Sequence, residues 1–392
     1  MKRSNLVPAV RSRLKRFPAP YSNYFGVVPL PPTEEPIAIG SAQPEHSSAE
    51  VALGRADLLA RQFPSHFMFS RVLVRQEAVA SSDIEGTHST LDALLEAEET
   101  DGLEATQDDI LVRDYAVALE RAIAEVQIHG SDAFTIHTIE HLHHALMRGD
   151  TNYQTRHGLP GEMRRRQVRI GGRGFADPIY NPPPYSDVLG CMAEQIAYLR
   201  CDGMQQLQKS VITQLAIAHA HFEAVHPFPD GNGRVGRLLL PLMLQAAGHT
   251  PLYLAPYILE FKSEYYDALR AAQQRLDYVP LIAHLSRAIV SSVVDIESAF
   301  NRLTLLNTEW LTRSKIRKNS SAYKLIGLLP GHPVITVGSV ERLLQVSNPA
   351  AGAAINQLTA IGVLTERTGK KRNRIFHARE VLEIYKNPGA GT

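Results

Sequence analysis

The segment His226-Pro-Phe-Pro-Asp-Gly-Asn-Gly-Arg-Val-Gly-Arg237 is the most informative part of this sequence. Its Gly-Asn-Gly turn opens a predicted helix over residues 234–247, which stops at Gly248. Backbone N–H groups at the start of a helix lie at the positive end of its dipole, and glycine lets a ligand approach them closely. The segment therefore predicts a phosphate-binding loop at the N-terminus of a helix.

The side chains of the segment supply the other groups that phosphoryl-type transfer requires. Arg234 and Arg237, three residues apart, lie on one helical face and can both contact phosphate oxygens. Asp230 is a hard oxygen ligand suited to Mg²⁺, and His226 can take a proton from an attacking hydroxyl. The predicted phosphate-binding residues are Gly231, Asn232, Gly233, Arg234, Gly236 and Arg237. The sequence has no Walker-type P-loop, so phosphate binding is expected at this loop instead. Its groups predict a Mg²⁺-dependent enzyme that carries out phosphoryl-type transfer to a hydroxyl.

Composition and charge are those of an ordinary globular protein. With 392 residues the chain exceeds what one hydrophobic core usually holds, and a net charge of +1 indicates no particular partner. The two cysteines, Cys191 and Cys201, make a disulfide framework implausible and favour a reducing compartment. The basic N-terminus lacks the apolar run of a signal peptide, and no apolar stretch is long enough to predict a membrane span. We expect a cytoplasmic protein without membrane contact.

Helical periodicity dominates the chain up to residue 306. Helices are expected at 67–80, 91–97, 106–128, 134–147, 185–200, 205–225, 234–247 and 281–306, and Pro241 should disturb the seventh of them. The opening 45 or so residues contain proline clusters and predict an extended arm. One hairpin is expected before residue 330, at 168–176, where alternating β-branched residues meet a glycine turn. The sequence thus predicts a mainly α fold with a single hairpin.

The region after residue 330 has a different pattern. Two short helices, the second over residues 348–361, precede two strands on either side of a turn at Gly369. This order resembles a winged helix-turn-helix. A basic wing leaves DNA binding through residues 330–392 open. The second helix is poor in Arg and Lys, which favours protein docking or dimer contacts instead. The wing residues are Arg367, Lys370, Lys371, Arg372 and Arg374.

The segment 226–237 matches the signature of the Fic family, His-x-Phe-x-[Asp/Glu]-Gly-Asn-Gly-Arg-x-x-Arg, at every defined position. The chain resembles that family over residues 50–300 or so, including residues 219–223 and the pair Gly161 and Arg164. The resemblance implies an all-helical core with one hairpin, and transfer of AMP from ATP to a Ser, Thr or Tyr hydroxyl of a protein. The residues that resemble the family's target-binding flap are Val168, Arg169, Ile170, Gly171 and Gly172.

The resemblance also implies a role for each part of the signature. His226 would act as the base, Asp230 would hold Mg²⁺, and the glycines would cradle the phosphates of ATP. The flap would bind the target segment by strand addition, a mode that reads backbone rather than sequence. The partner would be a protein with an acceptor hydroxyl, which can be the chain itself, and a homodimer is left open.

A second motif, Ser81-x-x-x-Glu85-Gly86, resembles the family's inhibitory motif. A glutamate placed against Arg237 would occupy the position of the γ-phosphate, so that ATP could bind only in a non-productive pose. Without the Fic signature, the same residues would predict only a helix cap and a turn. The Glu85 carboxylate could also align water and hydrolyse AMP from a modified protein, and the sequence does not separate these two uses.

Two further groups of residues give weaker indications. Tyr257, Tyr265 and Tyr266 resemble the adenine-side wall of the family, although an asparagine found in many relatives is absent; ordinary core aromatics are the alternative. The pair His137 and His141 has the spacing of two metal ligands on a helix, but helix packing is the better interpretation.

Together these patterns predict three parts of the chain. They are an N-terminal arm and helical region with the inhibitory motif at 1–125, a Fic catalytic core at 126–305, and a winged helix-turn-helix at 310–392. The predicted function is a protein adenylyltransferase that Glu85 inhibits. The alternatives are de-AMPylation, transfer of another nucleotide by the same site, and a DNA-binding regulator whose core senses a nucleotide.

Overall fold

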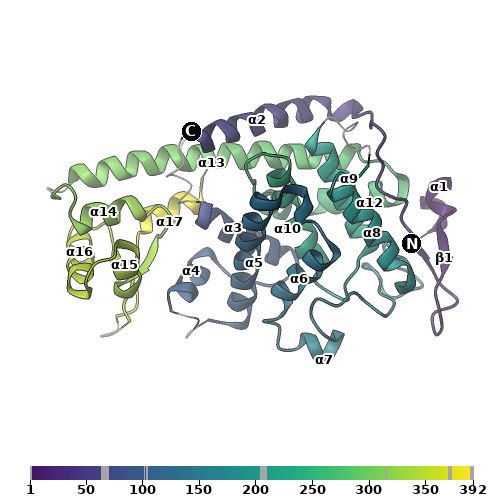
Figure 1. The fold of residues 1–392 in the computed structure, drawn as a ribbon, viewed down its shortest axis with the longest axis horizontal. Coiled ribbons are helices and arrows are strands. Elements are labelled where there is room, and N and C mark those ends of the chain that lie inside the picture. Colours follow the sequence, from purple (N-terminus) through teal and green to yellow (C-terminus); the bar gives the residue numbers. More distant parts are fainter. Residues whose placement is uncertain are drawn as a thin grey trace.

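Helices form most of this structure, a computed structural model that describes residues 2–62, 70–100, 102, 105–203, 210–313, 316–369 and 373–388. Among these residues there are two small antiparallel sheets, one near each end of the chain (Figure 1). The predicted mainly α fold is confirmed.

The segment 226–237 lies among helices that share one hydrophobic core. α9 (Val211–Val225) is buried on nearly every face, as expected for an apolar helix, and α10 (Asn232–Ala246) packs against it. α5 (Gln107–His129) and α6 (Ile136–Met147) also contact α10, and Thr106 caps α5 as its sequence predicts. The surrounding helices are α3 (Ser70–Ile84), α4 (Leu91–Glu99), α7 (Tyr153–His157), α8 (Val188–Leu199), α11 (Ala255–Glu260) and α12 (Lys262–Arg275).

Two long helices, α2 (Gln43–Gln62) and α13 (Val279–Arg313), run side by side along one edge of the molecule (Figure 1). Residues 281–293 of α13 belong to the core of α9 and α10, whereas residues 299–310 belong to a second cluster near the C-terminus. By length and composition alone α13 could cross a membrane, but 44% of its most apolar window is buried inside the structure. α13 therefore joins two packed regions.

The C-terminal region contains a three-stranded sheet in the order β3-β5-β4. The two helices and the strand pair expected around Gly369 are present, and β3 is an additional strand, too short to show alternation in the sequence. The wing residues Lys370, Lys371 and Arg372 lie outside the described residues. The elements are α14 (Ser321–Leu328), β3 (Val334–Thr336), α15 (Val337–Leu344), α16 (Asn348–Ala360), β4 (Thr365–Glu366), β5 (Ile375–His377) and α17 (Arg379–Lys386).

The N-terminal arm is more structured than expected. β1 (Leu14–Arg16) pairs antiparallel with β2 (Phe25–Val27), after η1 (Arg3–Asn5) and α1 (Pro8–Arg11). The expectation of an extended arm is wrong in this part, because strands of three residues give no detectable periodicity. The arm packs on the rest of the chain through a small apolar cluster that includes Tyr180 and Ala224.

The hairpin expected at 168–176 is reduced to one isolated antiparallel bridge, between Ile170 and Tyr180. Gly171 and Gly172 have φ angles of 58° and 72°, which end the extended conformation directly after Ile170. The segment still returns on itself, so the flap is present with less regular pairing than the sequence predicted.

Several helix boundaries differ from those expected. α3 continues to Ile84, so Ser81 and Ser82 are buried helical residues and not part of a polar turn. α10 continues through Pro241 to Ala246. The expected helix starts at 67 and 205 lie outside the described residues. Short 3-10 turns, which the sequence did not predict, are η2 (Gly40–Ala42), η4 (Gly130–Ala133) and η5 (Tyr185–Asp187).

Candidate active site

The loop between α9 and α10 is fixed by hydrogen bonds within its own length. His226 ends α9 in the left-handed conformation, with φ of 50° and ψ of 62°. The buried Asn232 side chain accepts a hydrogen bond from the Phe228 N–H at 2.8 Å and donates one to the Phe228 carbonyl at 2.9 Å. Gly231 has a φ of 80°, and a Cβ there would lie 2.8 Å from Sδ of Met147. Asn232, predicted as a phosphate ligand, therefore also shapes the loop through its side chain.

α6 holds this loop from outside through His143. Nδ1 of His143 accepts a hydrogen bond from the Gly161 N–H at 2.8 Å, so Nε2 carries the proton and donates to the Asp230 carbonyl at 2.9 Å. The imidazole also stacks on Phe228, with ring centroids 3.8 Å apart. Burial lowers the pKa of His143 to about 4, so the ring stays neutral and keeps one donor and one acceptor.

Arg164 clamps the backbone on the other side of the loop. Its Nε donates to the His226 carbonyl at 2.8 Å, and Nη2 donates to the Pro183 carbonyl at 2.8 Å. Burial lowers the pKa of Arg164 to about 10, so the group remains charged at neutral pH. The sequence placed Arg164 beside the flap but did not predict that it fixes His226, a residue 62 positions away.

Arg237, in the second turn of α10, is 1% exposed and is held by the end of α3. Its Nε donates to Oγ of Ser81 at 2.9 Å, and Nη2 donates to the Ser81 carbonyl at 2.8 Å and to Oε1 of Glu85 at 2.7 Å. Although burial raises it, the Arg237 guanidinium lowers the pKa of Glu85 below its usual value. The structure thus brings all three side chains together as an ion pair with a hydroxyl partner.

The Glu85 carboxylate rests on the first turn of α10. A Cβ at Gly233 would lie 2.1 Å from Oε1 of Glu85, so no residue larger than glycine fits at this position without a shift of Glu85. Lys262 of α12 donates to the Ile84 carbonyl at 2.7 Å and ties down the end of α3, and Gly86 follows with a φ of 86°. Glu85 therefore occupies the place where the helix N-terminus would bind an anion.

Arg234 lies near Glu85 but is not paired with it. Its side chain is 6% exposed and forms no hydrogen bond or ion pair within the described parts of the chain, and its Nε is buried. A buried guanidinium without a partner is costly, and an anion bound beside Arg234 would remove that cost. Arg234 is the strongest structural indication of an anionic ligand at this site.

His226 is the first residue of the loop, and the charged groups that affect it most through space are Arg164 and Glu85. Burial and, after it, the nearby Arg164 charge lower the pKa of His226 to about 4. Nδ1 of His226 is buried and has no partner at hydrogen-bonding distance and angle within the described residues. The imidazole is therefore neutral at pH 7 and can accept a proton.

Buried polar side chains of α9 and α12 pack against α10. Nδ1 of His219 donates to the Gly236 carbonyl at 3.1 Å, and its Nε2 accepts from the Tyr265 hydroxyl at 2.7 Å. Burial lowers the pKa of His219 to about 3 and raises that of Glu223 to about 7. Gly236 thus contacts these polar side chains through its carbonyl.

Asp230 offers an open carboxylate at the mouth of the loop. Its side chain is 55% exposed, Oδ1 accepts a hydrogen bond from the Gly231 N–H at 2.7 Å, and Oδ2 lies 3.9 Å from Nε2 of His157. Mg²⁺ commonly uses one or two carboxylates together with waters and substrate phosphates. Asp230 supplies one such open carboxylate, and no group of three or more potential metal-ligating side chains occurs in the described ranges.

The three tyrosines predicted at the adenine side lie near one another but differ in exposure: the rings of Tyr265 and Tyr266 are 5.2 Å apart, and Tyr257 and Tyr265 both contact His284. Tyr265 is fully buried beneath His219, and the Tyr257 hydroxyl accepts a hydrogen bond from α13. Tyr266 is exposed, and burial and then the Glu85 charge raise its pKa to about 12. Of the three, Tyr266 is therefore the ring that combines exposure with proximity to Glu85.

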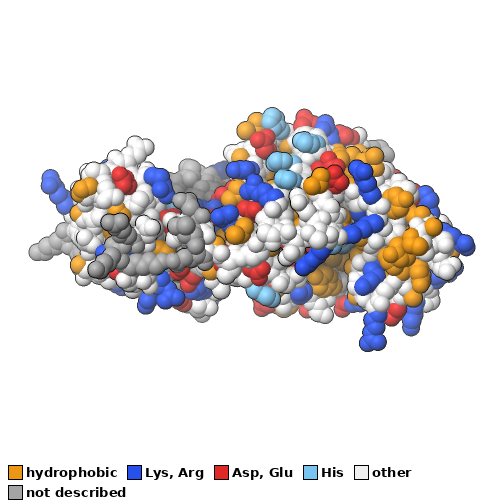
Figure 2. Space-filling view, turned by 90° about the horizontal axis from the view of Figure 1, so that it is seen from below, with side chains coloured by type: hydrophobic (Ala, Val, Ile, Leu, Met, Phe, Trp, Pro, Cys, Tyr) orange, Lys and Arg blue, Asp and Glu red, His pale blue; other side chains and the backbone are white. Residues whose placement is uncertain are grey.

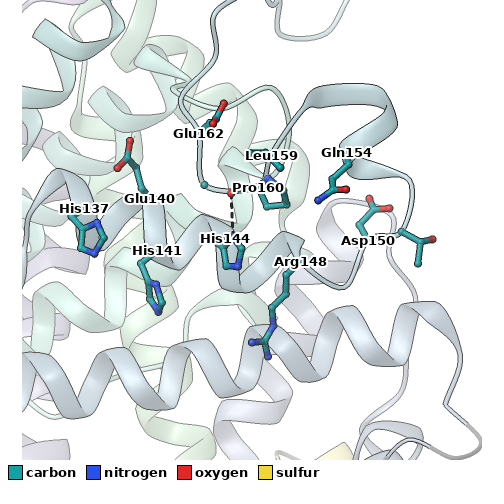
Figure 3. A pocket seen from close by; sticks show the side chains of 12 residues that line it. His137, Glu140, His141, His144, Arg148, Asp150, Gln154, Leu159, Pro160 and Glu162 are labelled. Atoms are coloured by element: carbon teal, nitrogen blue, oxygen red, sulfur yellow. Dashed lines mark hydrogen bonds between the residues drawn. The ribbon is translucent and has the colours of Figure 1, made fainter.

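The outer face of α6 borders a pocket of about 600 Å³, shown in Figure 3. His137 and His141 are exposed along it, so the helix packing expected for these two residues is wrong. Nδ1 of His144 donates to the Pro160 carbonyl at 3.1 Å, next to the Gly161 N–H that His143 binds. α6 thus holds the segment before the flap through two consecutive histidines.

Comparisons with known families agree with this geometry. Residues 133–244 match the model described as Fic/DOC family, and residues 43–124 match the Fic/DOC family N-terminal model. The Protein adenylyltransferase Fic of Culex quinquefasciatus is 32% identical over 114 residues, which are 29% of this chain and 20% of that protein. Protein adenylyltransferase fic-1 of Caenorhabditis briggsae is 32% identical over 133 residues, 34% of this chain and 24% of that protein. The match thus spans a fifth to a quarter of these relatives.

Solved structures show the same fold. A Fic family protein from Desulfovibrio desulfuricans G20 aligns with a TM-score of 0.55 at 20% identity, over 88% of this chain and 98% of that one. Fic-1 (residues 134–508) from C. elegans aligns with a TM-score of 0.50 at 20% identity, over 66% of this chain and 73% of the other.

Proposed function

We propose that this chain, which contains the two Fic/DOC family domains, is a protein adenylyltransferase that Glu85 holds in an inhibited state. It would move AMP from ATP to a Ser, Thr or Tyr hydroxyl of a protein. The similarity to proteins named adenylyltransferases supports the reaction class.

One observation carries the proposal: the Glu85 carboxylate lies on the first turn of α10 and pairs with Arg237. A carboxylate in this place marks an anion site, since it uses the same helix N-terminus and the same guanidinium that a phosphate would use. Arg234, buried and unpaired among the described residues, supplies a further cation. The site therefore suits a ligand with several negative charges, such as a triphosphate.

The chain's own residues account for the transfer step. His226, neutral at pH 7, takes the proton of the acceptor hydroxyl as its oxygen attacks the α-phosphorus of ATP. The new O–P bond forms as the bond from the α-phosphorus to the bridging oxygen breaks, and pyrophosphate leaves. Arg234 and Arg237 bind the outgoing phosphates. Asp230 would hold Mg²⁺, which neutralises phosphate charge when bound.

Intact-mass analysis of the purified Glu85→Gly protein with ATP and Mg²⁺ tests this proposal, and Glu85→Gly/His226→Ala is its matched control. We expect the first protein to gain one or more AMP groups and the second to gain none. AMP addition that persists without His226 would contradict its role as the base.

De-AMPylation is the second candidate, and one observation favours it. The Glu85 carboxylate is charged, one-third exposed and close enough to His226 to affect its pKa, so it could align water beside a bound AMP. An AMP-modified acceptor that loses AMP with the wild-type protein, but not with Glu85→Gly, would support this reaction in place of the transfer.

We infer further that residues 321–386 form a winged helix-turn-helix appended to the catalytic core. The helix order and the three-stranded sheet β3-β5-β4 support this assignment. Val72 of α3 and Leu91 and Leu95 of α4 pack in the hydrophobic cluster of this module. The module would therefore help to position α3, which ends directly before Glu85.

A further inference from the structure

Basic residues are concentrated in two segments of the chain. Residues 2–28 contain six Lys and Arg and no acidic residue, and residues 156–176 contain six Arg and one acidic residue, Glu162. The whole chain has 41 basic and 40 acidic residues, so these segments depart strongly from the average. Together they form a local positive charge that the overall net charge conceals.

The two segments lie against each other. The ring of Phe175 in the flap contacts Phe17, Tyr21 and Tyr24 of the N-terminal arm, with centroids 5.8, 4.5 and 6.0 Å apart. The backbone N–H of Val27 donates to the Asn181 carbonyl at 3.0 Å. Figure 2 shows Lys and Arg side chains along the end of the molecule where the arm lies. We call residues 2–28 and 156–176 together the basic face.

The cations of the basic face are almost all without a carboxylate partner. Lys15, which pairs with Asp187 at 2.6 Å, is the one member that forms an ion pair within the described residues. Arg156, Arg165 and Arg173 are exposed, and their side chains form no hydrogen bond there either. Outside the basic face, Arg71, Arg75 and Arg237 pair with glutamates, whereas Arg234 does not within the described chain. The basic face is thus available to an external anion.

The basic face also adjoins the candidate catalytic loop. Arg164 of the same segment donates to the His226 carbonyl at 2.8 Å. Arg166 hydrogen-bonds to His157, whose Nε2 lies 3.9 Å from Oδ2 of Asp230. A macromolecule bound along this surface would therefore reach the site where the acceptor hydroxyl must lie.

We propose that the basic face docks an acidic segment of the target protein, beside the hydroxyl that receives AMP. This inference rests on the proposed transferase function. The planar guanidinium of arginine can bind a carboxylate through two parallel hydrogen bonds. Positive charge around the acceptor site also raises the association rate with an acidic partner. The helices of this face, α1 and α7, have four and five residues, which are too short to fill a DNA major groove. An acidic polypeptide is therefore the better occupant.

Binding of labelled peptides, measured by fluorescence anisotropy without ATP, tests the proposal. The probes are a peptide with one Thr flanked on both sides by Glu and the same peptide with Gln in place of Glu. The protein is the 392-residue chain with Glu85→Gly/His226→Ala, in which the site is open and transfer is blocked. Two further variants are made in this background. The first carries Arg156→Ser/Arg165→Ser/Arg173→Ser. The second, the matched control, carries the distant triple Arg317→Ser/Lys318→Ser/Lys324→Ser.

We expect the Glu peptide to bind about tenfold more tightly than the Gln peptide, and to lose this advantage in the first triple variant but not in the control. The preference should shrink as NaCl rises from about 50 to about 300 mM. Equal affinity for both peptides, or equal loss in both triples, would overturn the proposal. So would tighter binding of a single-stranded DNA that depends on the same arginines. Because no ATP is present, failure of AMP transfer would count against the proposed function alone.

Discussion

Replacing Glu85 by alanine should raise the affinity for ATP by about tenfold. In the wild-type chain a phosphate must displace the carboxylate from Arg237 and from the first turn of α10. The contact is one charge-assisted hydrogen bond of 2.7 Å, and such bonds contribute about 1.5–3 kcal/mol. Because 33% of the Glu85 side chain is exposed, we take the lower end of this range, which corresponds to about a tenfold change in Kd.

Calorimetric titration with a non-cleavable ATP analogue and Mg²⁺ measures this effect. Asp83→Asn is the matched control, since Asp83 lies two residues before Glu85 and pairs with the exposed His88 at 2.5 Å instead of with Arg237. The control should leave Kd within about twofold of the wild type. The same Kd for wild type and Glu85→Ala, or an equal gain in Asp83→Asn, would refute the reasoning.

Three further predictions follow from the site. Because the pKa of His226 is lowered to about 4, the rate of AMP transfer by Glu85→Gly should be constant from about pH 8 to about pH 6. The rate should fall as the pH approaches 4. A rate that halves near the usual histidine pKa of about 6.5 would contradict this. Asn232→Ala leaves both backbone groups of Phe228 unpaired, and urea denaturation should show a loss of about 2 kcal/mol, whereas an unchanged free energy of unfolding would disprove the bracing role. Gln76→Ala removes the 2.7 Å bond from α3 to the Tyr385 carbonyl, so amides 81–85 should exchange deuterium faster; unaltered exchange would show that the C-terminal module does not steady α3.

The sequence predicted the place of the loop, between two helices, because its residues are consecutive. Residues 226–237 lie on one turn and one helix start, so their mutual arrangement follows from local geometry. α5 was likewise predictable, since Thr106 and Gly130 mark both of its ends.

The contacts that fix the loop could not be predicted in the same way. Arg164 reaches His226 across 62 positions, and His143 reaches Asp230 across 87. Neither residue has a local pattern that distinguishes it from an ordinary flap or helix residue. Only tertiary packing shows that both hold the loop.

The sequence also missed structure where elements are too short to show a period. β1 and β3 have three residues each, and pairing with distant partners decides their conformation. Tyr265 shows the same limit in a side chain: its spacing next to Tyr266 gave no sign that one ring is buried under His219 and the other exposed.

A crystal structure of Glu85→Gly with ATP and Mg²⁺ would test most directly whether Glu85 holds the place of the terminal phosphate. We expect a γ-phosphate oxygen within hydrogen-bonding distance of Nη2 of Arg237, where Oε1 of Glu85 lies in the wild-type chain, with the phosphates on the first turn of α10. A triphosphate bound away from Arg237, with that guanidinium still held by Ser81 alone, would contradict the proposed inhibition.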